Sequence, residues 1–339
     1  MGPVATGLAR PLGFDIADPA LEARILATLS DVETRLHEVV HSDDPLIAEA
    51  SVHLVDAGGK RFRPLLVALA AQFGDSTSPD VVDAAIVVEL THLATLYHDD
   101  VMDEAVVRRG APSANSRWTN SVAILVGDFL FSRAASVAAD LGEGAVKIQA
   151  DTFSRLVHGQ IAETVGPRDS DPVEHYLHVI AEKTGSLIAT SARFGAMFAR
   201  TPAAQVEALA RYGETIGIAF QLSDDLLDIS SDSEESGKTP GTDLREGVPT
   251  LPVLYALAND DGDPDSVRLR EILAAGPITD DDQHQEALRL LRASSAFKQA
   301  RATVRAYAEA GRTQLGALPP GTPRDALESM CDFIADRTS

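Results

Sequence analysis

Apolar residues recur at three- and four-residue spacing along most of this chain, and runs that alternate apolar with polar positions are few. This spacing is typical of amphipathic helices, and long segments of Ala, Leu, Arg and Glu add helix propensity. The pattern therefore predicts an all-α protein. We expect helices over residues 21–40, 47–55, 63–72, 79–99, 116–140, 146–165, 173–200, 203–228, 251–257, 266–275, 280–293, 295–315 and 324–337.

Turn-rich stretches separate these helices, and none of them is a long low-complexity linker. Apolar helices continue on both sides of each break, which favours a single large helical domain over residues 1–339. Residues 1–20 are expected to form a flexible N-terminal arm. The breaks fall at residues 57–59, 109–112, 230–247 and 259–264.

Composition narrows the functional classes. The 339 residues include 51 Asp and Glu against 29 Lys and Arg, a formal net charge of −22, so no nucleic-acid partner is expected. A hydrophobic content of 45% excludes wholesale disorder. Cys331 is the single cysteine, which excludes an intramolecular disulfide and fits a reducing compartment. Since no segment reads as an export signal or a membrane span, we expect a cytoplasmic protein without a transmembrane segment.

One short pattern recurs far apart in the chain. Asp-Asp-x-x-Asp occurs at residues 99–103 and again at 224–228, each time at the end of an apolar stretch. At about 100° per residue these positions cover roughly a third of a helix, so each cluster is expected to point three carboxylates one way. Carboxylates without cysteine suit Mg²⁺, which completes its shell with water and phosphate oxygens. The pattern predicts a diphosphate held through Mg²⁺ by Asp99, Asp100, Asp103, Asp224, Asp225 and Asp228.

Basic residues lie beside the clusters despite the negative total. Residues 58–64, Gly-Gly-Lys-Arg-Phe-Arg-Pro, form a glycine turn that leads into a helix start, which is a suitable anion site. Arg108 and Arg109 follow the first cluster. The chain has only five lysines, and Lys183 and Lys238 are among those in marked segments. These cations are candidates for binding a diphosphate.

Together these motifs resemble the all-trans polyprenyl diphosphate synthases, the family that includes farnesyl, geranylgeranyl and longer-chain synthases. The resemblance implies an antiparallel helical bundle around a deep central cavity, the type I isoprenoid synthase fold, usually as a homodimer. It implies a prenyltransferase of isoprenoid biosynthesis that joins isopentenyl diphosphate to an allylic diphosphate head to tail and releases pyrophosphate. The matching segments occur in the family's order at residues 58–64, 92, 98–103, 108–110, 127–128, 183–184, 220–228 and 237–244.

The resemblance also implies a role for individual residues. Three Mg²⁺ ions would be held by Asp99, Asp103 and Asp224, with the other three aspartates in support, and would assist ionisation of the allylic substrate. Val248 departs from the family, because many relatives carry Lys there; this concerns affinity for the allylic substrate. Arg108, Lys183 and Lys238 would bind the allylic diphosphate. Gly59, Lys60, Arg63, His92 and Arg109 would bind isopentenyl diphosphate. Thr184 and Gln221 would face the allylic cation.

Product length depends on residues before the first cluster. The growing chain needs an apolar tunnel along that helix, because water would quench the cation. Family members that stop early carry bulky aromatics where this chain has Ala94 and Thr95, so we expect a product longer than C20, in the C30–C50 range. Phe129 or Phe131 is the alternative closure of the tunnel, which would give a geranylgeranyl-length product. Tyr97 is expected to point away from the tunnel.

Three other functions compete with this interpretation. A class I terpene cyclase would also use an Asp-rich helix, but it lacks a segment like residues 58–64 and an all-Asp second motif. Glu89 and His92 have the Glu-x-x-His spacing of di-iron bundles, although a second copy is missing. A noncatalytic partner subunit typically loses aspartates, and all six are present here.

Overall fold

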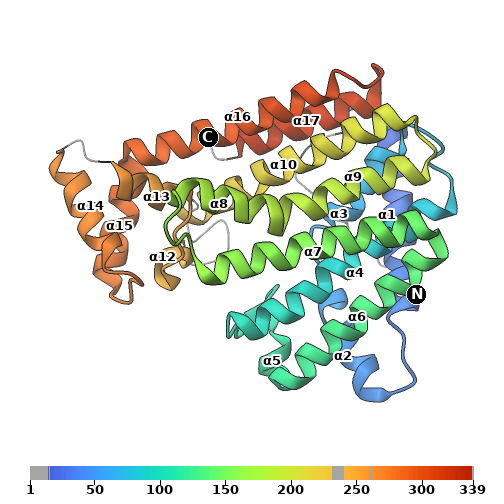
Figure 1. Cartoon of the computed structure of the whole chain (residues 1–339), viewed down its shortest axis with the longest axis horizontal. Helices are drawn as coiled ribbons and strands as arrows, with labels where there is room; N and C mark the ends of the chain where they lie inside the picture. The colour runs from blue at the N-terminus through green and yellow to red at the C-terminus, as the bar shows by residue number, and fades with distance from the viewer. Residues whose placement is uncertain (1–13, 15, 231–239, 260–261, 338–339) are drawn as a thin grey trace, which may run out of the picture. The chain divides into compact units, whose positions relative to one another are not determined.

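The computed structural model describes residue 14 and residues 16–230, 240–259 and 262–337. Helices dominate these residues, which confirms the predicted all-α class (Figure 1). Two-residue strands β1 (Val107–Arg108) and β2 (Ala111–Pro112) form one small hairpin. The helices are α1 (Pro19–Val39), α2 (Pro45–Asp56), α3 (Phe62–Ala71), α4 (Pro79–Met102), α5 (Ala114–Arg117), α6 (Asn120–Leu141), α7 (Glu143–Val165), α8 (Pro172–Ile180), η1 (Ala181–Gly185), α9 (Ser186–Phe198), α10 (Ala203–Ser230), α12 (Thr242–Glu246), α13 (Leu251–Ala258), α14 (Pro264–Ala274), α15 (Asp281–Ala293), α16 (Ser295–Leu315) and α17 (Thr322–Asp336).

Four helices begin with the same two-residue signal, Asp followed by Pro. The Asp carboxylate accepts hydrogen bonds from backbone N–H groups of the first turn, and the Pro has no N–H that needs a partner. Replacing such a cap with Ala typically costs about 1 kcal/mol. The capping residues are Asp18, Asp44, Asp171 and Asp263.

The predicted helix over residues 173–200 is interrupted. Its middle is a π-helical turn, Ala181–Gly185, between α8 and α9. A π-turn inserts one extra residue into the helical repeat and changes the direction of the following side chains. The prediction was therefore right about the helical segment and wrong about its regularity, and the irregular turn carries Lys183 and Thr184.

Contacts divide the described chain into two compact units. Unit 1 contains the described residues of Met1–Arg155 with Leu187–Gly213 and Gln314–Ser329, and unit 2 contains those of Leu156–Ser186, Glu214–Thr313 and Met330–Ser339. The expectation of a single domain stays a prediction.

Helix α4 is the centre of unit 1, where it contacts α1, α3, α5 and α6. Its side chains are buried on several sides, including Ile86, Leu90 and Leu93, and each such side chain contributes about 1.5–3 kcal/mol on burial. By length and composition, α4 and α6 are also the two described helices that could cross a membrane. Most of the apolar window of α4 is buried inside the fold, as expected for a core helix.

Unit 2 contains the second aspartate cluster. Helices α13, α14 and α15 contact one another and lie side by side (Figure 1). Helix α17 meets the cluster-bearing part of α10, where the Ser223 hydroxyl donates to the Ile334 carbonyl at 3.3 Å. These contacts bring the end of the described chain to the second cluster.

Candidate active site

The first aspartate cluster occupies the last turn of α4. Asp100 is fully buried; its Oδ1 accepts from Arg108 Nε at 2.6 Å and its Oδ2 from the Ala114 backbone at 3.4 Å. Asp103 is exposed, with 56% of its side chain accessible and Arg108 Nη2 at 3.8 Å. Arg108 therefore contacts the carboxylates of both Asp100 and Asp103, although Asp100 is buried and Asp103 is exposed.

The β1–β2 hairpin places the two adjacent arginines. Its turn residues Arg109 and Gly110 both have positive φ, 55° and 78°, as a two-residue turn of type I′ requires. Arg108 therefore reaches the first cluster, whereas Arg109 Nη1 donates to the carbonyls of Leu54, at 2.9 Å, and Gly58. One hairpin thus connects the first aspartate cluster with the glycine turn after α2.

The glycine turn depends on close approach to Arg109. Gly58 and Gly59 have φ values of 76° and 141°, which disfavour any residue with a side chain. A Cβ on Gly59 would lie 2.9 Å from Arg109 Cζ, whereas a Cβ on Gly58 would have nothing within 4 Å. Lys60, the next residue, is exposed. Gly59 therefore leaves the space that the Arg109 guanidinium fills.

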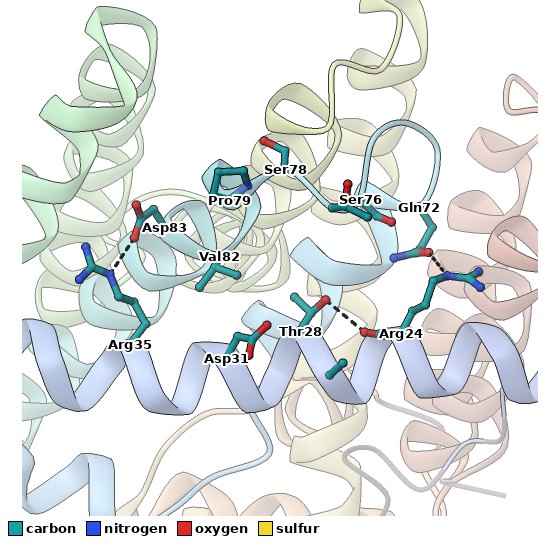
Figure 2. Close-up of a pocket in the computed structure, with 12 residues that line it drawn as sticks. Arg24, Thr28, Asp31, Arg35, Gln72, Ser76, Ser78, Pro79, Val82 and Asp83 are labelled. Carbon is teal, nitrogen blue, oxygen red and sulfur yellow. Dashed lines mark hydrogen bonds and ion pairs between the residues drawn. The ribbon is translucent and has the colours of Figure 1, made fainter.

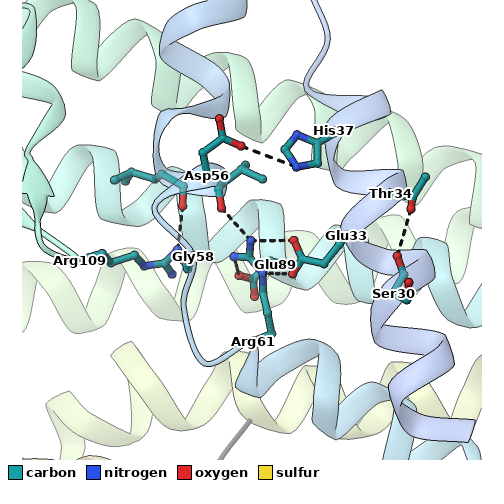
Figure 3. Close-up of polar contacts among 11 residues, drawn as sticks. Ser30, Glu33, Thr34, His37, Asp56, Gly58, Arg61, Glu89 and Arg109 are labelled. Carbon is teal, nitrogen blue, oxygen red and sulfur yellow. Dashed lines mark hydrogen bonds and ion pairs between the residues drawn. The ribbon is translucent and has the colours of Figure 1, made fainter. Parts of the chain in front are cut away.

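A partly buried basic cluster lies beside this turn. Arg63 Nε is buried and has no hydrogen-bond partner within the described part of the chain. Burial, together with Arg109, lowers the pKa of Arg63 to about 10, although Glu89 opposes the shift. Burial and the nearby Arg63 and Arg109 hold the pKa of His92 well below its usual value. Figure 3 shows how Arg109 meets the turn at Gly58. Such a group of cations, with an unsatisfied buried donor, fits an anion.

The second cluster lies on α10. Asp225 is buried and accepts hydrogen bonds from the Tyr176 hydroxyl and from Gln221 Nε2, the latter at 3.0 Å. Burial raises the pKa of Asp225 well above its usual value, and Asp243 and Asp228 add to the shift. Asp228 accepts from the first backbone N–H groups of α12, at 3.2 Å. Burial and Asp228 likewise raise the pKa of Asp243 to about 7.

Asp224, the first residue of this cluster, meets the end of the described chain. Arg337 Nη2 lies 2.9 Å from Asp224 Oδ1, and Arg337 Nε donates to Ser223 Oγ at 2.6 Å. The guanidinium also lies 4.5 Å from the Phe220 ring centroid. Asp224 is therefore paired with a cation in this structure.

The π-turn brings the expected allylic residues to the same part of unit 2. Thr184 Oγ1 donates to Gln221 Oε1 at 3.3 Å. Lys183 Nζ is paired with Glu163 at 2.5 Å. Lys238, the third expected cation, lies outside the described residues. Val248 is exposed on the surface.

The expected chain-length residues lie on α4. Ala94 is fully buried, and Thr95 donates to the His92 carbonyl at 2.7 Å. Tyr97 is also buried; its hydroxyl donates to the Ala50 carbonyl and accepts from the Leu54 backbone at 3.3 Å. This side chain therefore points toward α2, and its place away from a tunnel stays a prediction.

The aromatic alternatives for closing the tunnel lie on α6. The Phe131 ring centroid lies 4.4 Å from that of Phe153 and 5.7 Å from that of His98. Phe129 instead has the Arg133 guanidinium 4.8 Å from its centroid. Phe131 therefore belongs to an aromatic group that includes α4, on which Ala94 and Thr95 also lie, whereas Phe129 packs against a charged side chain.

A cavity of about 610 Å³ lies elsewhere in unit 1, between α1 and the segment that joins α3 to α4 (Figure 2). Its polar side chains already contact one another: Arg24 donates to Gln72 at 3.0 Å and Arg35 to Asp83 at 3.0 Å. It contains none of the site residues expected from the sequence. The cavity is therefore separate from the candidate active site.

The structure thus groups the expected residues into two sets. In unit 1 the first cluster, the hairpin arginines, the glycine turn, Arg63 and His92 lie close together; in unit 2 the second cluster lies with Gln221, Thr184 and Lys183. Sequence reasoning missed the partners of the aspartates, Tyr176 and Arg337, because neither belongs to a recognisable motif. Asp243 lies within residues 237–244, one of the segments that resemble the family. That resemblance was the sequence signal from which Asp243 could have been identified.

The donors in both clusters fit Mg²⁺. They are carboxylate oxygens, which this hard cation prefers, and phosphate oxygens and water usually complete its shell. Among the described residues no three His, Cys, Asp or Glu side chains are arranged so that they could hold a metal ion by themselves.

Comparison with known proteins agrees with the fold. The family model described as polyprenyl synthetase matches residues 44–291. The chain is 48% identical over 327 residues to nonaprenyl diphosphate synthase of Mycobacterium tuberculosis, covering 96% of this chain and 97% of the relative. It is 43% identical over 319 residues to dimethylallyltranstransferase of the same organism, covering 94% and 96%.

A solved structure is similar over nearly the whole chain. Geranylgeranyl pyrophosphate synthase of Corynebacterium glutamicum, crystallised with calcium and isoprenyl diphosphate, has a TM-score of 0.86 and 46% identity, covering 96% of this chain and 99% of that one. Other relatives are named as heptaprenyl diphosphate synthase component 2, from Geobacillus stearothermophilus, and octaprenyl diphosphate synthase, from Haemophilus influenzae. The fold and the site define an all-helical trans-prenyltransferase, and the chain belongs to the polyprenyl synthetase family.

Proposed function

We propose that this enzyme condenses isopentenyl diphosphate with an allylic prenyl diphosphate, head to tail and trans, to make a polyprenyl diphosphate. The observation that carries the proposal is the buried Nε of Arg63, which has no partner among the described residues, in a protein of net charge −22. A buried unsatisfied donor costs about 1–3 kcal/mol, and a bound diphosphate would supply its acceptor. Lys60, His92 and Arg109 complete this isopentenyl diphosphate site. Gly59 has no side chain and so leaves space for the Arg109 guanidinium.

The allylic diphosphate is assigned to the two aspartate clusters. Asp99, Asp103 and Asp224 would hold three Mg²⁺ ions, which supply charge neutralisation for the departing diphosphate. Asp100, Asp225 and Asp228 support them. Arg108, Lys183 and Lys238 bind diphosphate oxygens. Thr184 and Gln221 present oxygen dipoles to the allylic cation, and their hydrogen bond at 3.3 Å orients both side chains.

The product is longer than C20, in the C30–C50 range. The small side chains of Ala94 and Thr95 support this length, as do relatives named for nonaprenyl, octaprenyl and heptaprenyl products. Incubation of purified protein with isopentenyl diphosphate, Mg²⁺ and each allylic primer, followed by chromatography of the products, tests the proposal. Ala94→Phe is expected to shorten the product. Lack of condensation with every primer would refute the reaction, and an unchanged product length in the variant would refute the tunnel assignment.

The protein is proposed to be a cytoplasmic homodimer. Large apolar side chains are exposed on α6 and on the unit 1 part of α7, namely Ile124, Leu125, Val146 and Phe153, and a second copy would cover them. Light scattering after size exclusion is expected to show a dimer that Leu125→Glu converts to a monomer. Val267→Glu, at an exposed position of α14, is the matched control and should remain dimeric.

A further inference from the structure

Arg61 lies between two residues assigned to isopentenyl diphosphate, yet its own guanidinium is buried in a different set of contacts (Figure 3). Its Nε and Nη2 donate to the two carboxylate oxygens of Glu33, at 2.5 and 3.1 Å. Its Nη1 donates to Glu89 at 2.9 Å, and its Nη2 also donates to the Val55 carbonyl at 3.0 Å. The guanidinium is therefore engaged on each of its three nitrogens.

The two glutamates of this network favour a charged Arg61. Only 9% of the Arg61 side chain and 2% of the Glu89 side chain are exposed. Burial opposes the charge on Arg61, but Glu33 and Glu89 together outweigh it and raise its pKa. Arg61 thus stays charged with its donors directed to protein oxygens, and it has little capacity left for a diphosphate.

The three partners come from three helices. Glu33 lies on α1, Val55 near the end of α2 and Glu89 on α4, so Arg61 joins all of them to the start of α3. The preceding turn contains two glycines, which by themselves allow many backbone conformations. Arg61 itself has a φ of 45°, a left-handed conformation that residues other than Gly rarely adopt. Its side-chain contacts hold the end of the turn in this conformation.

Glu89 also acts on the basic cluster. It raises the pKa of Arg63 and of Arg109 through its charge, although neither pKa reaches its usual value. Because Glu89 is hydrogen-bonded to Arg61, its carboxylate is fixed beside the cluster instead of being free to close over it. Arg63 Nε consequently keeps its unmet capacity for an anion.

We propose that Arg61, through Glu33 and Glu89, is a positioning residue for isopentenyl diphosphate. It fixes the turn from which Lys60 and Arg63 extend, and so sets the geometry of the basic cluster before the substrate binds. This inference rests on the proposed function, because it takes the basic cluster to be the isopentenyl diphosphate site.

Two variants and a matched control test the inference. Arg61→Lys keeps the charge but cannot make the forked contacts. Glu33→Gln weakens the bidentate pair at a side chain that is 37% exposed, so it is expected to fold. Arg35→Gln removes a different contact between α1 and α4, the 3.0 Å pair with Asp83, and leaves the turn untouched. The readouts are the KM for each substrate, kcat and the thermal unfolding temperature.

Arg61→Lys and Glu33→Gln are expected to raise the KM for isopentenyl diphosphate about tenfold, while the KM for the allylic substrate and kcat change by less than about twofold. Arg35→Gln should change neither KM. An unchanged KM for isopentenyl diphosphate, or an equal rise in both KM values, would overturn the inference. A wild-type protein without condensation activity would refute the proposed function instead. Calorimetry with isopentenyl diphosphate would then decide the inference: about tenfold weaker binding by Arg61→Lys supports it, and equal binding overturns it.

Discussion

Gly59→Ala should weaken isopentenyl diphosphate binding because the new methyl group would displace Arg109. The added Cβ would lie 2.9 Å from Arg109 Cζ and 3.0 Å from both terminal nitrogens, and the backbone φ of 141° adds strain. A hydrogen bond to a charged group contributes about 1.5–3 kcal/mol. Loss of one such bond from Arg109 to the diphosphate would raise the KM for isopentenyl diphosphate roughly 10- to 150-fold, since about 1.4 kcal/mol corresponds to a factor of ten.

Gly58→Ala is the matched control for this prediction. Gly58 also has positive φ, 76°, so alanine costs about 1–2 kcal/mol of stability there, but its Cβ would have nothing within 4 Å. Steady-state kinetics at saturating allylic substrate, together with thermal unfolding, would separate the two effects. Equal KM values for isopentenyl diphosphate in Gly58→Ala and Gly59→Ala would refute the proposed contact between Arg109 and the substrate.

Three further predictions concern charge. Burial lowers the pKa of Arg63 to about 10, so its guanidinium loses a proton as the pH rises through that value. Calorimetry should therefore show the affinity for isopentenyl diphosphate falling between about pH 9 and pH 11, more steeply in the wild type than in Arg63→Gln. Equal slopes in the two proteins would contradict the assignment of Arg63 to this substrate. Asp100→Asn should reduce the free energy of unfolding, measured in urea, by about 3 kcal/mol, because it disrupts a buried ion pair. Asp103 is exposed, so Asp103→Asn should lower turnover while the free energy of unfolding stays nearly unchanged. Arg337→Gln should strengthen Mg²⁺ binding in the presence of pyrophosphate roughly 3- to 10-fold by freeing Asp224, and weaker or unchanged binding in calorimetry would contradict that competition.

Sequence patterns predicted most of the helices because their signals are local. The spacing of apolar residues predicted α16 with the bounds that the structure gives. It placed the four helix starts marked by Asp followed by Pro one or two residues too late. The π-turn at Ala181–Gly185 was not predicted, because the spacing of apolar residues is judged over a window much longer than one inserted residue. The hairpin was expected only as a turn, since a strand of two residues has no period to detect.

The site was less predictable than the fold because its contacts join distant residues. The motifs identified the expected ligands, and the structure places those of each unit near one another. The orientation of Asp100 depends on the hairpin, and that of Asp225 on Tyr176, which lies 49 residues away in the sequence. Arg61 is inside a recognised motif, yet its role depends on Glu33 and Glu89, each 28 residues distant. Local patterns carry no information about such partners.

The middle aspartate of each cluster is buried against a polar neighbour, and this matters for protein design. Asp100 is buried against Arg108 and Asp225 against Tyr176, so neither helix presents three equivalent carboxylates. A designer who transplanted an Asp-Asp-x-x-Asp helix into another scaffold would carry over a buried carboxyl group without the neighbour that satisfies it. The transferable part is the helix together with that neighbour, the hairpin arginine in one case and the tyrosine of a separate helix in the other.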